Sequence, residues 1–114
     1  MMQAHATTRQ AGNVAVVDLS GSITVAGGTG LLRSTIKELV AAGHKNLLLN
    51  LRDLKYLDSA GMGELVEACT TLRNQGGDLK LVHPQQRITN LLRMTKLSTI
   101  FAIFADEPAA LQSF

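Results

Sequence analysis

A carboxylate, a hydroxyl and two glycines come together in one short segment, YLDSAGMG at residues 56–63. It joins an apolar run to a helical pattern, and the free backbone N–H groups and dipole of a helix start favour an anion there. Ser59 is therefore placed to carry a phosphate. The same residues also suit a structural role, because Asp58 or Ser59 would cap the helix, and Gly61 and Gly63 would permit close packing or give a partner access to the backbone. Spacing alone does not decide between these interpretations.

The other chemistry-bearing residues form no catalytic or metal-binding pattern. Ser59 lies in Asp-Ser-Ala-Gly rather than a Gly-x-Ser-x-Gly elbow, and no histidine occupies an expected triad position. His5, His44 and His83 are isolated in the sequence, which favours solvated or capping roles over metal binding. Cys69 falls in an apolar stripe, where a buried thiol is inert. We therefore expect no enzymatic activity, no cofactor and no metal.

Two further phosphate-related interpretations have less support. The glycine-rich segment AGGTG at residues 26–30 lacks the Lys and Ser/Thr of a Walker motif. A receiver domain with Asp53 or Asp58 as phosphoacceptor would need an acidic pair after its first strand, where residues 14–21 offer only Asp18.

Composition limits the classes of partner. The 114 residues are 46% hydrophobic and 18% charged, which predicts one packed domain over residues 1–114. The eleven Lys and Arg residues are scattered and only 4% of residues are aromatic, which argues against a nucleic-acid partner. No apolar run approaches the ~20 residues of a membrane-spanning helix, and the N-terminus lacks the features of a signal peptide. We expect a cytoplasmic protein without direct membrane contact.

Hydrophobic periodicity predicts alternating strands and helices. Polar residues 3–10, a turn at residues 11–13 and an apolar run over residues 14–19 indicate a hairpin with an exposed edge strand. The elements expected after it are a helix over 29–42, a central strand over 47–51, a helix with an apolar stripe over 62–72, a strand over 79–82, a helix around 88–92, a strand over 101–104 and a short helix from 106. The class is α/β, with a mostly parallel sheet of four to five strands, an antiparallel N-terminal edge strand and about four helices. Functional groups should gather in the loops 21–30 and 54–63, where strands end and helices begin.

The segment DSAGMGELVEA, residues 58–68, resembles the D-S-[SA]-G-[LM]-G signature of STAS-domain anti-sigma factor antagonists. The preceding strand at 46–51, the segment 76–82 and the segment 92–104 follow in the order of that family, so the resemblance covers nearly the whole chain. It implies a bacterial partner-switching cycle that regulates transcription. A GHKL-type serine kinase that is also an anti-sigma factor phosphorylates the signature serine, here Ser59, and a PPM-type phosphatase restores it. Unphosphorylated protein binds the kinase and frees the sigma factor. The alternative is a small STAS subunit that binds the ATPase of an ABC-type lipid transport system.

Two positions depart from the pattern of that family, and both concern carboxylates that the family often places beside its phosphoacceptor. The loop that often reads Gly-x-Leu-Asp in relatives ends in Thr24 here, and the Asp that often ends the central strand is Asn50. Fewer negative charges would repel a phosphate less, but contacts that orient the hydroxyl would also be lost. Met62 has a second interpretation, as a core residue of the helical stripe. The expected partner-binding patch consists of Asp58, Ser59, Ala60, Gly61 and Met62 with Thr24, Gly27 and Gly28.

Overall fold

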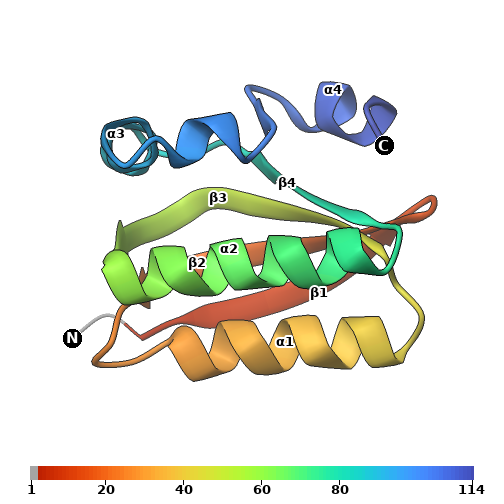
Figure 1. Ribbon diagram of the computed structural model, residues 1–114, viewed down its shortest axis with the longest axis horizontal. Helices are drawn as coiled ribbons and strands as arrows, with labels where there is room; N and C mark the ends of the chain where they lie inside the picture. The colour runs from red at the N-terminus through yellow and green to blue at the C-terminus, as the bar shows by residue number, and fades with distance from the viewer. Residues whose placement is uncertain (1–2) are drawn as a thin grey trace.

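The computed structural model describes residues 3–114, apart from the side chain of Thr29, as a five-stranded sheet with four α-helices (Figure 1). The strands are His5–Ala11 (β1), Val14–Ile23 (β2), Asn46–Leu57 (β3), Asp78–Val82 (β4) and Ile103–Phe104 (β5). The helices are Thr29–Ala41 (α1), Ser59–Asn74 (α2), Gln86–Met94 (α3) and Glu107–Gln112 (α4), with a 3-10 turn at Leu97–Thr99 (η1). The spatial order is β1-β2-β3-β4-β5, and only the β1–β2 pair is antiparallel. The predicted α/β class, edge strand and helix number are confirmed.

The N-terminal hairpin closes through the two-residue turn Gly12-Asn13. Gly12 has a φ of 61°, a conformation that glycine adopts without the steric cost that a Cβ would bring. Ala11 pairs with Val14, and the pairing continues without interruption to His5 opposite Ser20. The hairpin tip lies at the opposite end of the molecule from the start of α2 (Figure 1).

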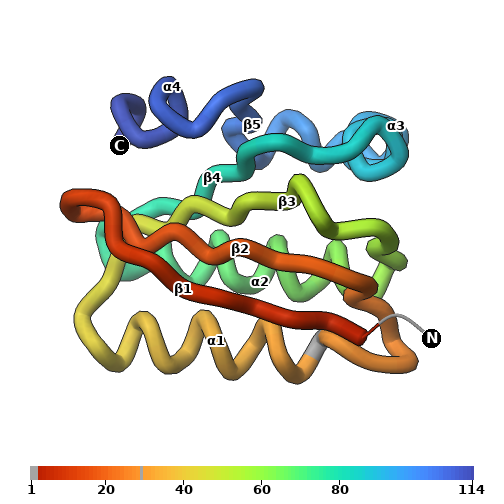
Figure 2. Tube along the Cα trace, turned by 180° about the vertical axis from the view of Figure 1, so that it is seen from behind, coloured from red at the N-terminus to blue at the C-terminus, as the bar shows by residue number. Residues whose placement is uncertain are grey.

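The central strand β3 carries the core on both of its faces. Leu47, Leu49 and Leu51 belong to the larger apolar cluster, which includes residues of α1 and α2. Leu48 points the other way, into a smaller cluster with Ala110 of α4. Because side chains alternate along a strand, burial on both faces requires the continuous apolar run seen in the sequence. Figure 2 shows α1 and α2 together behind the sheet, on one face of it.

Three strands differ in length from the sequence-based expectation. β2, expected over residues 14–19, extends to Ile23. β3 was expected to end at Leu51 but continues to Leu57, with Leu54 and Leu57 also buried. This second half pairs only with β2, across register shifts that break the regular alternation. At the other end of the chain, Phe101 is buried, but only Ile103 and Phe104 pair with β4.

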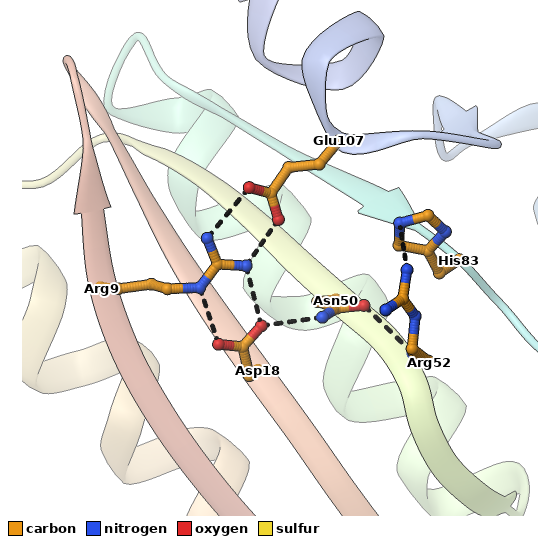
Figure 3. A network of polar contacts seen from close by, with 6 residues as sticks. All are labelled: Arg9, Asp18, Asn50, Arg52, His83 and Glu107. Atoms are coloured by element: carbon orange, nitrogen blue, oxygen red, sulfur yellow. Dashed lines mark hydrogen bonds and ion pairs between the residues drawn. The ribbon is translucent and has the colours of Figure 1, made fainter.

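A network of charged side chains ties the edge strand to the C-terminal helix on the sheet face away from α1 and α2 (Figure 3). The Arg9 guanidinium donates to both oxygens of Asp18, at 2.8 and 3.1 Å, and to both oxygens of Glu107, at 2.9 and 2.5 Å. Asn50 Nδ2 also donates to Asp18 Oδ1, at 2.8 Å. The hydrogen bonds from Arg9 hold the pKa values of Asp18 and Glu107 below their usual range. Asp106 caps α4 by accepting the N–H of Ala109 at 2.9 Å.

Within the described part of the chain, no helix combines the length and the apolar character needed to cross a bilayer.

We predict that Arg9→Gln lowers the free energy of unfolding by about 1 kcal/mol near neutral pH, because these ion pairs are partly exposed to solvent. The folded-state pKa values of both carboxyl groups are lowered. Their contribution is therefore complete above the unfolded-state pKa of about 4 and is lost as the pH falls through the folded-state values. The difference in urea stability between wild type and variant should shrink at acid pH. Arg93→Gln, at an exposed position, is the control. A pH-independent difference would contradict the ion-pair origin.

Candidate functional site

The helix α2 begins under a side-chain cap from Asp58. Asp58 has extended backbone geometry at the N-cap, and its Oδ1 accepts the N–H of Gly61 at 2.9 Å. Of the two residues that the sequence offered as caps, Asp58 takes this role. Ser59 is the first helical residue and is exposed to solvent. Its side chain makes no hydrogen bond with any described residue, so its hydroxyl is accessible from solvent.

The second oxygen of Asp58 holds the facing loop. Asp58 Oδ2 accepts the N–H of Val25 at 2.9 Å, and the N–H of Asp58 donates to the carbonyl of Ile23 at 3.4 Å. Within the loop, Thr24 and Gly27 exchange two backbone hydrogen bonds, of 2.8 and 3.0 Å. The N–H of Val25, and then that of Gly61, hold the pKa of Asp58 below its usual range. Asp58 is therefore ionised at neutral pH, and one carboxylate connects the loop to the helix.

Two glycines allow this close approach of loop, strand and helix. A Cβ on Gly61 would collide with the carbonyl oxygen of Ile23 and lie 2.6 Å from Leu57 Cδ1. Gly28, at the N-cap of α1, has a φ of 96°, and a Cβ there would lie 2.6 Å from the carbonyl oxygen of Ser22. Gly63 is different, because a Cβ at that position would meet nothing within 4 Å. The sequence left the role of both motif glycines open, and the structure assigns close packing to Gly61 only.

A groove of about 900 Å³ lies beside this site. One wall is the loop, with Thr24, Ala26, Gly27 and Gly28, and the other includes Tyr56 with Arg87 and Leu91 of α3. Asp58 also lines it. The Arg87 guanidinium carbon lies 4.6 Å from the centre of the Tyr56 ring. We call this hollow the Arg87 groove. Figure 1 shows the start of α2, the loop before α1 and α3 at the same end of the molecule.

Most of the expected patch is assembled at this end. Asp58, Ser59, Ala60, Thr24, Gly27 and Gly28 meet where the loop contacts the start of α2. Gly61 is close to them but buried against β2. Sequence reasoning missed Tyr56, Arg87 and Leu91 of the groove. The available signal was the helical spacing that places Arg87, Leu91 and Met94 on one face of α3.

Met62 does not lie on the exposed face, and that expectation is wrong. Its side chain is 7% exposed and belongs to the larger core cluster. The Thr95 hydroxyl lies 4.0 Å from Met62 Sδ, so the end of α3 packs beside the first turns of α2. The spacing of Met62 with Leu65 and Cys69 indicated this core role, which the structure bears out.

Asn50 does not belong to the Ser59 site either. It lies seven residues before the end of β3, roughly 23 Å along an extended strand. Its side chain joins the network with Asp18 on the far sheet face (Figure 3). The expectation that position 50 lies beside the phosphoacceptor is therefore corrected, because β3 continues well past it. Thr24 is the departure that changes the charge of this site.

The described residues contain no group of three or more His, Cys, Asp or Glu side chains positioned to hold a metal ion. Burial raises the pKa of the Cys69 thiol, which lies in the core cluster.

Comparison with known proteins gives consistent matches over almost the whole chain. The family described as STAS domain matches residues 5–110. The anti-sigma-B factor antagonist of Bacillus subtilis (strain 168) is 31% identical over 111 residues, which cover 97% of this chain and 100% of that protein. Two solved structures share the fold at lower identity. An anti-sigma factor antagonist from Mycobacterium paratuberculosis has a TM-score of 0.85 at 21% identity, covering 97% of this chain and 93% of that one. The Bacillus cell fate determinant SpoIIAA in its phosphorylated form has a TM-score of 0.72 at 17% identity, covering 96% and 100%.

The mixed sheet with its loop-and-helix site thus defines a STAS domain. The family match over residues 5–110 and the match to the Bacillus subtilis protein show that the chain belongs to the family of STAS-domain anti-sigma factor antagonists.

We predict opposite effects of adding a methyl group at the two motif glycines. Gly61→Ala should lower the free energy of unfolding by about 1–3 kcal/mol, because the new Cβ overlaps Ile23 and Leu57. Gly63→Ala should raise it by about 0.5–1 kcal/mol, because alanine fits the open helical position and stabilises a helix relative to glycine. Urea denaturation of both variants measures the difference. Equal effects at the two positions would contradict the close approach of α2 to β2.

Proposed function

We propose that this protein is an anti-sigma factor antagonist whose affinity for its anti-sigma factor partner is set by phosphorylation of Ser59. The observation that carries the proposal is the unengaged Ser59 hydroxyl at the first position of a 16-residue helix, within a loop-and-helix site that Asp58 holds together. The full-length match to an anti-sigma-B factor antagonist supports the same function. The chain would act as a passive substrate and ligand rather than as an enzyme.

The exposed position of Ser59 at the start of α2 can accommodate a phosphate, which a buried serine could not. Asp58 accepts the N–H of Gly61, and the N–H of Ser59 remains at the helix start, where the helix dipole favours negative charge. Because the unmodified side chain makes no hydrogen bond with the described residues, adding a phosphate breaks no hydrogen bond among them. The same fold accommodates a phosphorylated form in SpoIIAA. Phosphorylation should therefore leave the stability of this domain nearly unchanged.

The effect should fall on the complex. A phosphate adds about −1.5 to −2 charges beside the ionised Asp58 carboxylate. A partner surface matched to a neutral hydroxyl would then face uncompensated charge and a desolvation cost. The proposed contact residues are those of the assembled patch, namely Asp58, Ser59, Ala60, Thr24, Gly27 and Gly28, without the buried Gly61. The proposed partners are a GHKL-type anti-sigma factor serine kinase and a PPM-type serine phosphatase.

We predict that incubation with the cognate kinase, ATP and magnesium adds one phosphoryl group to wild-type protein, as measured by intact mass. Ser59→Ala should gain none. Ser98→Ala, which removes an exposed hydroxyl from η1, is the matched control and should be phosphorylated like wild type. Without kinase the mass should not change, because the described residues contain no catalytic constellation that we can identify.

Full-stoichiometry phosphorylation of Ser59→Ala would show that the acceptor has been wrongly assigned. Co-purification with an ABC-type ATPase in place of a serine kinase would contradict the anti-sigma factor function and favour a transport subunit.

A further inference from the structure

The helix α3 carries an exposed stripe beside the Ser59 site. Arg87, Leu91 and Met94 are spaced four and three residues apart, which places them on one helix face next to the buried Ile88 and Leu92. Leu91 lines the Arg87 groove, and Met94 is 79% exposed.

The loop across the groove presents a second exposed apolar side chain. Val25 is 80% exposed, although Asp58 fixes its backbone N–H. Among the described residues, Val25 and Met94 are the most exposed of the large apolar side chains. Val25 belongs to the loop that forms one wall of the groove, and Met94 lies on the same face of α3 as Leu91, which lines the other wall, so an apolar side chain is exposed to a partner on each side.

The two charged residues that line the groove, Arg87 and Asp58, do not form an ion pair with each other. Arg87 lies over the Tyr56 ring but forms no ion pair with a described carboxylate. The carboxylate that lines the groove, Asp58, already accepts backbone N–H groups on both of its oxygens. The guanidinium therefore has donors that no described residue uses, and it lies over an aromatic ring.

We propose that the Arg87 groove docks a segment of the anti-sigma factor partner that places a carboxylate against Arg87 and apolar side chains against Val25 and Met94. This inference rests on the function proposed above and adds the chemistry by which the partner is recognised. A carboxylate matches the planar guanidinium in a bidentate pair, and an arginine with a tyrosine is a frequent anchor of protein interfaces. Arg87 is thus the specificity-determining residue of the surface.

The position of Arg87 also explains why phosphorylation would oppose binding. Ser59 directly follows Asp58, which lines the same groove, so a phosphate on Ser59 adds negative charge beside the docked segment. The partner carboxylate and the phosphate then repel one another. A partner segment with a neutral or basic residue at this point would lack that repulsion.

The test is a calorimetric titration of the cognate anti-sigma kinase with four proteins: wild type, Arg87→Gln, Arg87→Glu and Lys37→Glu. Lys37 is exposed on α1, outside the groove, and its reversal changes the net charge as much as that of Arg87. We expect Arg87→Gln to bind about 10-fold and Arg87→Glu about 100-fold more weakly than wild type, with Lys37→Glu within about twofold. Thermal melts establish that all four proteins are folded.

Salt dependence separates a charge contact from a packing role. Wild-type affinity should fall as salt rises from about 0.05 to 0.5 M, and that of Arg87→Gln should fall less. Binding of Arg87→Glu with wild-type affinity would overturn this inference while leaving the anti-sigma factor antagonist function intact. Failure of wild-type protein to bind the kinase would overturn the proposed function and this inference together.

Discussion

The carboxylate of Asp58 joins two segments that lie 33 positions apart in the sequence. One oxygen caps the start of α2 and the other holds the N–H of Val25, so the helix start and the loop before α1 take fixed positions relative to each other. The approach depends on Gly61, because any larger residue would push α2 away from the carbonyl of Ile23. Ser59 is left exposed at the point where these constraints meet, and its hydroxyl makes no hydrogen bond with the residues that the structure describes.

The two faces of the sheet carry different contacts, and the charged network lies on the face away from Ser59. Helices α1 and α2 bury the larger core on one face. On the other face, Arg9 connects Asp18 of β2 with Glu107 of α4, and Asn50 extends that network to β3 (Figure 3). The charged groups that stabilise the C-terminal helix therefore lie away from Ser59. A phosphate at Ser59 changes the surface offered to a partner while the groups that stabilise the fold keep their contacts.

The order of elements and the mostly parallel sheet with its antiparallel edge strand were predictable from the sequence, because they follow from hydrophobic periodicity and from the geometry of strand-helix-strand units. The helical spacing of Met62, Leu65 and Cys69 likewise contained the core role of Met62. The position of Asn50 was not predictable, since the second half of β3 departs from regular alternation. The groove was not predictable either. Tyr56 and Arg87 are 31 positions apart in the sequence, and only the packing of α3 against the sheet brings their side chains together.

The central claim is that the state of Ser59 sets partner affinity without changing the fold. Calorimetric titration of the cognate kinase with unmodified protein, stoichiometrically phosphorylated protein and Ser59→Ala tests it most directly. A penalty of about 3 kcal/mol from uncompensated charge predicts roughly hundredfold weaker binding of the phosphorylated form. Ser59→Ala should bind like unmodified protein, and thermal melts of all three should agree closely. Equal affinity of the phosphorylated and unmodified forms for the kinase would contradict the account.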